Sequence, residues 1–220
     1  MSLPAPTVHP LGEGAWTVAL GEHVDPAIHE RVLALAAQVA RAELPFVQEI
    51  VPAYAALSVF FDPLRADAEA IREQLTALAA EPLPTPGPAE LPTARLVTVP
   101  VRYDGPDLEE VAARTGLTRA EVVRRHTSRE YRVYLLGFAP GFAYLGELDP
   151  ALVLPRRREP RTRVAAGSVA IAGAQTAVYP LATPGGWHLL GSTATRMFDP
   201  QRDPPALLQP GDRVRFEAIE

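Results

Sequence analysis

Hydrophobic positions in the first eighty residues follow two periods, one typical of helices and one typical of strands. Apolar side chains recur at helical spacing from Ile28 to Val39, after Asp25 and Pro26, a pair that is typical of a helix start. A second apolar stripe predicts a helix over residues 66–80. Three short apolar runs predict strands, so the order of elements indicates a small α+β layer with helices on one face of a sheet. The predicted strands are Ala15–Leu20, Val47–Val51 and Leu57–Phe61.

Residues after about 95 carry a different pattern. A strand-like run at 96–103 precedes two short helices, and the spacing predicts capping boxes at their starts, Asp107 with Glu110 and Thr118 with Glu121. Every later apolar segment is short and bounded by Gly or Pro, which is typical of an antiparallel barrel or sandwich. The predicted strands are Tyr131–Phe138, Ser168–Ala172, Thr176–Leu181, Trp187–Leu190 and Arg213–Ala218.

Proline marks the boundary between these two patterns. Five of the 24 prolines lie between Pro82 and Pro92, with Gly87 among them. Such a segment holds neither a helix nor a central strand, so it reads as an extended linker. The sequence therefore predicts a small α+β domain over 1–80, a linker over 81–94 and a barrel domain over 95–220.

Composition excludes several kinds of chemistry. The chain has no cysteine, and all 21 of its basic residues are arginine, so thiolate nucleophiles, a phosphate-binding lysine and Schiff-base chemistry are excluded. A net charge of -5 argues against a nucleic-acid partner. No apolar run is long enough to cross a membrane, and no basic stretch precedes an apolar one at the start. A cytoplasmic protein without a membrane partner is expected.

Histidine and serine give few candidates for catalysis. The five histidines show no chelating spacing, so no metal site is expected, and no serine lies in a G-x-S-x-G turn. His126 ends a predicted helix, where a cation favours the helix dipole, so a structural role and a catalytic role both stay open. The run Pro155–Arg163 carries a charge of +4, which suits either an anion contact or a solvated loop.

Two glycine-rich loops are the stronger candidates for a binding site. Residues Gly137–Gly146 hold three aromatic side chains, and such loops either plug a core or line a pocket. In Gly173–Pro180, Gln175 lies at a turn, with Thr176 on one face of the following strand and Tyr179 on the other. A pocket with polar anchors results if the two loops meet over one mouth of the barrel.

Several motifs occur in a fixed order along the chain: Val51–Tyr54, Phe61–Pro63, His126, Tyr131–Gly146, Pro155–Pro180, Pro184–Trp187, Phe198–Pro200 and Pro210–Val214. In this order they resemble the B subunits of bacterial ATP-dependent 5-oxoprolinases. The same family includes the sporulation-kinase inhibitor KipI and the first half of the carboxyltransferase domain of urea carboxylase and allophanate hydrolase. The resemblance covers nearly the whole chain, although Ala143 and Ala165 stand where the family usually has proline, and His188 and Ser192 also depart from it.

The resemblance implies a cyclophilin-like barrel and a composite enzyme. An A subunit and a C subunit of related barrel fold are its expected partners, and the assembled complex opens 5-oxoproline to glutamate with ATP. The alternatives are a KipI-like inhibitor of a histidine kinase and a carboxyltransferase half that acts on urea or allophanate.

Residues for this chemistry come from the two loops and their neighbours. An amide is a poor electrophile, so ATP is expected to phosphorylate the lactam oxygen, while arginines and turn N–H groups hold the developing charge. The predicted catalytic residues are Gln175, Tyr179 and His126. The predicted substrate-binding residues are Tyr144, Arg163, Thr176 and Trp187.

Overall fold

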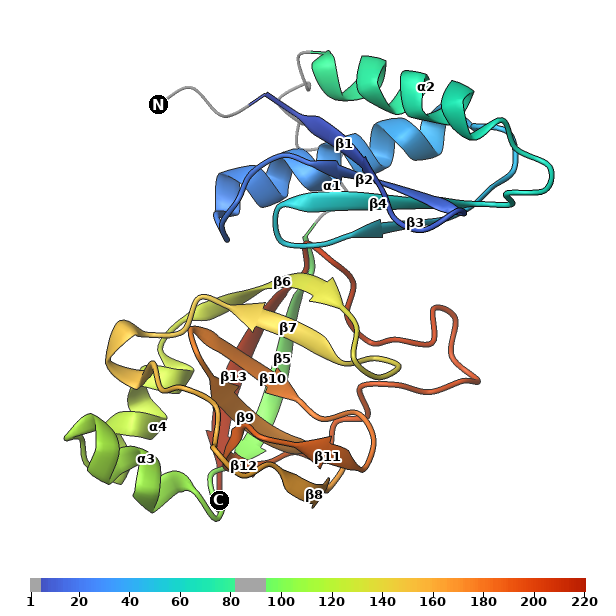
Figure 1. The fold of residues 1–220 in the computed structure, drawn as a ribbon. Coiled ribbons are helices and arrows are strands. Elements are labelled where there is room, and N and C mark those ends of the chain that lie inside the picture. The colour runs from blue at the N-terminus through green and yellow to red at the C-terminus, as the bar shows by residue number, and fades with distance from the viewer. Residues whose placement is uncertain (1–4, 82–93) are drawn as a thin grey trace. The chain divides into compact units, whose positions relative to one another are not determined.

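The chain divides into two compact units, Met1–Thr93 and Ala94–Glu220, in a computed structural model that describes residues 5–81 and 94–220 (Figure 1). Almost all of the predicted linker, residues 81–94, lies outside the described residues, so the linker stays a prediction.

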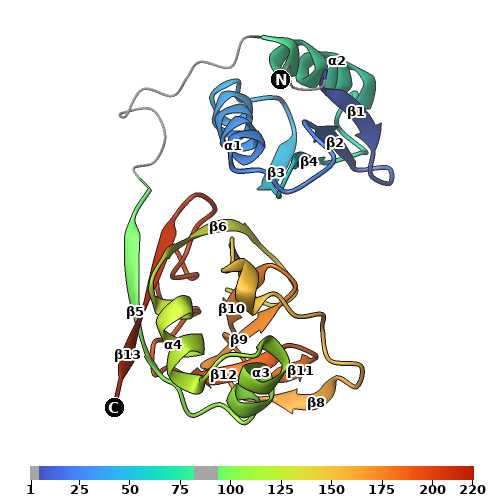
Figure 2. The ribbon, with the colours of Figure 1, turned by 90° about the vertical axis from the view of Figure 1, so that its left-hand side faces the viewer.

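The first unit is a four-stranded antiparallel sheet in the order β1-β2-β4-β3, with both helices on one face (Figure 2). Val32 of the first helix and Leu75 of the second pack with Val18 and Leu57 of the sheet in one buried core. The Asp25 carboxylate accepts hydrogen bonds from two backbone N–H groups of the first helical turn, which confirms the predicted cap. The elements are β1 Thr7–Pro10, β2 Ala15–Ala19, α1 Pro26–Arg41, β3 Val47–Pro52, β4 Ala56–Phe61 and α2 Ala68–Ala80.

The second unit is a closed barrel of seven strands in the order β10-β7-β6-β13-β5-β12-β9. All neighbouring strands are antiparallel except β5 and β13, which pair in parallel over seven residues, so the expected antiparallel barrel contains one parallel seam. The rest of the barrel supplies the long crossover that parallel strands need. The strands are β5 Leu96–Arg102, β6 Glu130–Leu136, β7 Ala143–Gly146, β9 Ser168–Ala172, β10 Gln175–Val178, β12 His188–Ser192 and β13 Arg213–Ile219.

Five short elements of this unit lie outside the barrel wall. Strands β8 (Arg161–Val164) and β11 (Thr183–Gly185) form a separate two-stranded sheet, and a 3-10 turn covers Pro150–Leu152. Helices α3 (Leu108–Thr115) and α4 (Arg119–Thr127) bury apolar side chains in the same core as the barrel interior. The two helices therefore belong to the barrel unit.

The helix starts show one confirmed cap and one correction. The capping box of Thr118 and Glu121 is present at the start of α4. The box predicted for Asp107 and Glu110 is wrong, because the Asp107 side chain makes no capping hydrogen bond. Two arginines and one backbone N–H from distant segments use the Asp107 carboxylate instead.

Candidate functional site

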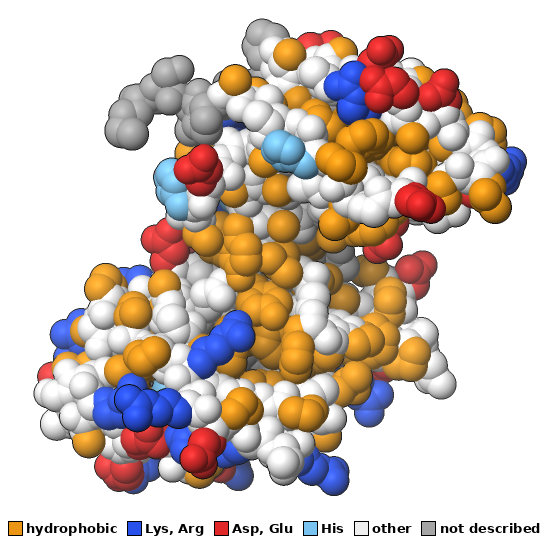
Figure 3. Space-filling view, in the orientation of Figure 1, with side chains coloured by type: hydrophobic (Ala, Val, Ile, Leu, Met, Phe, Trp, Pro, Cys, Tyr) orange, Lys and Arg blue, Asp and Glu red, His pale blue; other side chains and the backbone are white. Residues whose placement is uncertain are grey.

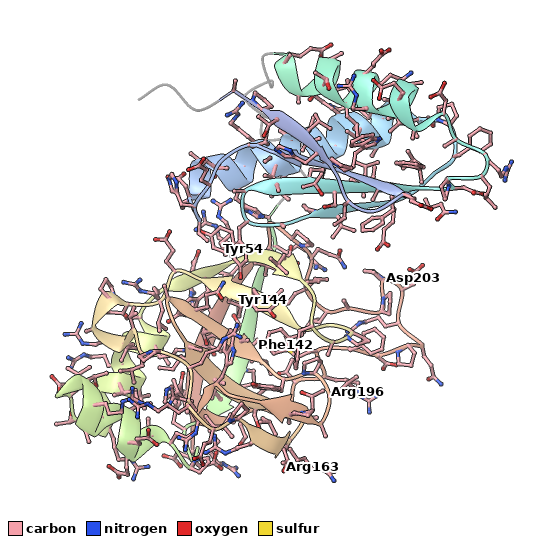
Figure 4. The ribbon with its side chains drawn as sticks, viewed as in Figure 1. Tyr54, Phe142, Tyr144, Arg163, Arg196 and Asp203 are labelled. Carbon is pink, nitrogen blue, oxygen red and sulfur yellow. The ribbon has the colours of Figure 1, made fainter. Side chains whose placement is uncertain are left out.

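Five aromatic rings form a cluster on the outer wall of the barrel, where they pack against side chains of β9, β10 and β12. Phe142 lies at its centre, with ring centroids 5.0 Å from Tyr144, 5.2 Å from Phe138, 5.4 Å from Tyr179 and 5.7 Å from Trp187. All four pairs meet edge to face, an arrangement that stabilises aromatic clusters beyond their buried area. Phe142 comes just before β7 and Tyr144 lies within it, so both rings come from one segment (Figure 4). Hydrophobic side chains gather on this face of the barrel unit (Figure 3).

The connection between β6 and β7 is a tight turn that sets the position of Phe142. The Gly137 N–H donates to the Phe142 carbonyl oxygen at 3.0 Å, and the Phe142 N–H donates to the Ala139 carbonyl oxygen at 2.9 Å. Phe138 has a φ of +68°, which is uncommon for a bulky residue, and its side chain is 62% exposed. Backbone strain of this kind clusters at ligand-binding segments, so it marks this turn as a candidate binding segment.

A cavity of about 150 Å³ opens beside the aromatic cluster. Gly185 borders it, and a Cβ atom there would lie 2.2 Å from the Tyr179 hydroxyl oxygen, so only glycine fits against this tyrosine. Burial raises the pKa of the Tyr179 phenol, although a backbone hydrogen bond from Trp187 opposes the rise. The phenol is therefore neutral at neutral pH. The cavity is lined by Phe138, Phe142, Tyr144, Arg156, Arg157, Pro160, Tyr179, Pro184, Gly185, Gly186 and Trp187.

An ion-pair network holds the arginine run against the barrel beside this cavity. Arg157 Nη1 donates to Asp107 Oδ1 at 3.1 Å and to Glu110 Oε2 at 2.7 Å, and Arg161 Nη2 donates to Asp107 Oδ1 at 2.6 Å. The other oxygen of Asp107 accepts the Leu189 backbone N–H at 2.7 Å. The hydrogen bond from Arg157 is the main cause that lowers the pKa of Glu110. These groups fix the position of the segment from which Arg156 extends.

A second cluster of polar side chains lies inside the barrel, around His126. Its Nδ1 is 2.7 Å from the Tyr103 hydroxyl and its Nε2 is 2.8 Å from the Thr176 hydroxyl. Thr176 donates its single hydroxyl proton to the Ala170 carbonyl oxygen, so Nε2 carries the imidazole proton and Tyr103 donates to Nδ1. Complete burial lowers the pKa of His126 to about 3, and the Phe216 ring stacks on the imidazole at 4.6 Å.

The structure brings together three of the seven predicted site residues. Tyr144, Tyr179 and Trp187 line the cavity, and their catalytic and substrate-binding roles stay predictions. His126 and Thr176 bond to each other in the barrel interior and are absent from the lining. Burial keeps the His126 imidazole neutral, so no cation meets the helix dipole there, and the predicted catalytic role of His126 stays a prediction.

Gln175 and Arg163 lie elsewhere. Gln175 begins β10 opposite Ala172 in the β9–β10 hairpin, and it is absent from the cavity lining. Arg163 is exposed on β8, and its side chain extends away from the barrel (Figure 4). Neither residue is in the lining of the cavity that Tyr144 borders, and their predicted roles stay predictions.

Sequence reasoning left Phe142, Arg156 and Arg157 out of the site. Phe142 is one of the three aromatics in the loop Gly137–Gly146, and both arginines belong to the run with a charge of +4. The signal was therefore present, but residue type alone did not separate Arg156 from Arg163.

Among the described residues, no group of three or more His, Cys, Asp and Glu side chains is arranged to hold a metal ion. The described helices include none that is long and apolar enough to cross a membrane.

Comparison with known proteins gives one consistent result. Residues 6–208 match the family described as carboxyltransferase domain, subdomain C and D. The chain is 39% identical to the B subunit of 5-oxoprolinase from Bacillus subtilis (strain 168) over an alignment of 229 positions, which covers 96% of this chain and 92% of that protein. It is 45% identical to the B subunit of 5-oxoprolinase from Escherichia coli O157:H7 over 210 residues, which cover 94% and 93%.

A solved structure shows the same fold. The crystal structure of TTHA0988 superposes with a TM-score of 0.81 at 45% sequence identity. The match covers 94% of this chain and 40% of that chain, so the larger part of TTHA0988 lies outside the match.

Proposed function

This chain belongs to the family of the carboxyltransferase domain, subdomain C and D, and from that membership we propose that it is the B subunit of an ATP-dependent 5-oxoprolinase. The enzyme opens the lactam ring of 5-oxo-L-proline to L-glutamate and hydrolyses ATP in the process. An A subunit and a C subunit of related barrel fold complete it, and the complex acts in the cytoplasm. The observation that carries the proposal is the identity of 39% and 45% to two proteins of that name along almost their full length.

The outer-wall cavity is the proposed site for the lactam ring. Pockets for drug-sized ligands enclose about 300–1,000 Å³, whereas a cavity of about 150 Å³ in another protein holds a single benzene ring. The cavity here, at about 150 Å³, therefore suits one small ring. Tyr144 and Trp187, whose rings lie 6.0 Å apart, supply apolar walls for such a ring.

Residues of this chain bind and orient the lactam in the proposed reaction. A lactam carbon is a poor electrophile, and transfer of the γ-phosphoryl group of ATP to its oxygen, with release of ADP, makes it a better one. Water then adds to the carbon and the C–N bond breaks as the nitrogen takes up a proton. A second water releases phosphate from the resulting acyl phosphate, which leaves glutamate. The neutral Tyr179 hydroxyl accepts the Trp187 backbone N–H, which leaves its own proton to donate to a ligand oxygen. The cavity is too small for a nucleotide, so ATP binds elsewhere in the complex.

Reconstitution tests this function. The chain alone, and the chain with its cognate A and C subunits, are assayed for ADP and glutamate released in the presence of 5-oxoproline. We expect turnover by the complex and none by the chain alone. Full turnover by the chain alone contradicts the composite enzyme, and no turnover by the complex contradicts the substrate.

The exposed Phe138 favours a second candidate, a KipI-like inhibitor of a histidine kinase. An apolar side chain 62% exposed beside a cavity suits contact with a protein segment. This candidate requires that the chain stops kinase autophosphorylation and that Phe138→Ala releases the inhibition. The family description favours a carboxyltransferase as a third candidate, and transfer of a carboxyl group from carboxybiotin to urea in the presence of the chain tests it.

A further inference from the structure

Charge is distributed unevenly around the outer-wall cavity. Arg156 and Arg157 are the charged side chains in its lining, and none of the described lining residues is acidic. Arg157 is neutralised by Asp107 and Glu110, with which it forms two ion pairs at 3.1 and 2.7 Å. The positive charge that remains at the cavity is that of Arg156.

Arg156 lies near the Trp187 ring and keeps its capacity to bind an anion. Its guanidinium carbon lies 6.0 Å from the centroid of that ring, at the outer limit of a cation–π contact. In the part of the chain that the structure describes, no ion pair or hydrogen bond engages its guanidinium, and the side chain is exposed. The ion pair of the neighbouring Arg157 fixes the backbone beside Arg156. The five N–H donors of Arg156 are therefore available to a ligand beside the aromatic rings.

We propose that Arg156 binds the carboxylate of the lactam substrate while the ring lies against Trp187 and Tyr144. This inference rests on the proposed function, because 5-oxoproline supplies both the ring and the carboxylate. A guanidinium matches a carboxylate through two parallel N–H···O bonds, and the guanidinium of Arg156 lies on the side of the cavity that Trp187 walls. A phosphate would match the same fork, but the size of the cavity favours a single-ring carboxylate over a nucleotide.

The test compares the substrate with an analogue that lacks only the carboxylate, 2-pyrrolidinone. Wild-type, Arg156→Ala, Arg156→Lys and Arg158→Ala chains are each assembled with the A and C subunits. Arg158 is the matched control, because it is an exposed arginine of the same run that does not line the cavity. The measurements are kcat and KM for 5-oxoproline, and the inhibition constant of 2-pyrrolidinone.

Loss of a charge-assisted pair predicts a rise in KM of about ten- to hundredfold for Arg156→Ala, with little change in kcat. Arg156→Lys is expected to recover part of the loss, and Arg158→Ala to behave like wild type. Inhibition by 2-pyrrolidinone stays the same in all four, since it offers no carboxylate. An unchanged KM in Arg156→Ala overturns the proposal, and so does an equal weakening of 2-pyrrolidinone, which would make Arg156 a wall of the cavity only.

Equilibrium titration of the same full-length chains separates this inference from the proposed function. Binding of 5-oxoproline that Arg156→Ala removes supports the carboxylate contact even if the complex shows no turnover. Inorganic phosphate and ATP are titrated as competitors. Binding of either that depends on Arg156, without binding of 5-oxoproline, assigns the residue to phosphate and overturns the carboxylate proposal.

Discussion

The barrel holds two clusters of aromatic and polar side chains, one in its interior and one on its outer wall, and they differ in what they leave unsatisfied. Inside, both ring nitrogens of His126 have partners, and the Thr176 hydroxyl both accepts and donates. On the outer wall, Arg156 lies over an aromatic ring without an ion-pair partner among the described residues. The polar groups around His126 in the interior already have their hydrogen-bond partners, whereas Arg156 on the outer wall can still bind an anion.

This difference shows why residue type is a poor guide to catalysis here. Histidine is the side chain most often used for acid–base work, because its ordinary pKa is near neutrality. Burial in the barrel lowers the pKa of His126 to about 3, so the imidazole neither gains nor loses a proton near pH 7. Its hydrogen bonds join helix α4 to the interior of the barrel.

The largest expected effect is on stability, and it comes from the interior cluster. His126→Ala removes a fully buried ring and leaves the Tyr103 and Thr176 hydroxyl groups without their partner. We expect a loss of about 3–5 kcal/mol in the free energy of unfolding, the size seen for buried aromatic truncations. Urea denaturation measures it. A loss below about 1 kcal/mol would show that the interior network matters little.

The next effect is a dependence of stability on pH. The folded pKa of His126, about 3, lies below the unfolded value of about 6.5, so protons bind the unfolded chain more readily. The stability that neutral His126 gives is complete above pH 6.5 and is lost as the pH falls from 6.5 toward 3. The slope approaches about 1.4 kcal/mol per pH unit. The difference between wild-type and His126→Gln unfolding curves from pH 7 to pH 4.5 isolates it, and parallel curves would contradict it.

Gly185→Ala perturbs the outer wall alone. The new methyl group would lie 2.2 Å from the Tyr179 hydroxyl oxygen, so the tyrosine must move. We expect kcat/KM of the complex to fall about tenfold or more, because small displacements in a pocket are costly, while overpacking costs about 1–3 kcal/mol of stability. Gly186→Ala is the comparison variant: Gly186 lines the same cavity, but its new methyl group meets no atom closer than 3.6 Å and does not displace Tyr179. Equal activity of both variants contradicts a role for Tyr179.

Gln175→Ala gives the smallest expected effect. Gln175 lies at the β9–β10 hairpin and outside the cavity lining, so the present geometry predicts activity within about twofold of wild type. A loss of tenfold or more at an unchanged melting temperature would restore the catalytic role that its sequence motif suggested. The assay is the same ATP- and 5-oxoproline-dependent turnover.

The sequence pattern predicted the two kinds of architecture and most of the long elements, because they depend on local periodicity. It missed β1, β7, β8 and β11, each of which has three or four residues and too few positions to show alternation. Strand β11 even contains proline and glycine, which normally indicate a loop. These strands form because of pairing with distant segments, which local patterns do not record.

Distance along the chain also explains what was missed at the site. Asp107 has the spacing of a capping residue, but partners 50 and 54 residues away use its carboxylate instead. Tyr144, Tyr179 and Trp187 were predictable, because aromatics beside glycine turns line pockets. The distinction between Arg156 and Arg163 depends on which arginine lies over Trp187, and only the folded chain shows that.

One measurement tests the central claim, that the ligand binds the outer wall and not the barrel interior. Tyr144→Ala and His126→Gln are assembled with the A and C subunits, and kcat/KM for 5-oxoproline is measured for each and corrected for the folded fraction. The account predicts at least about a tenfold loss for Tyr144→Ala and a value within about twofold of wild type for His126→Gln. The reverse result, with Tyr144→Ala active and folded His126→Gln inactive, would contradict it.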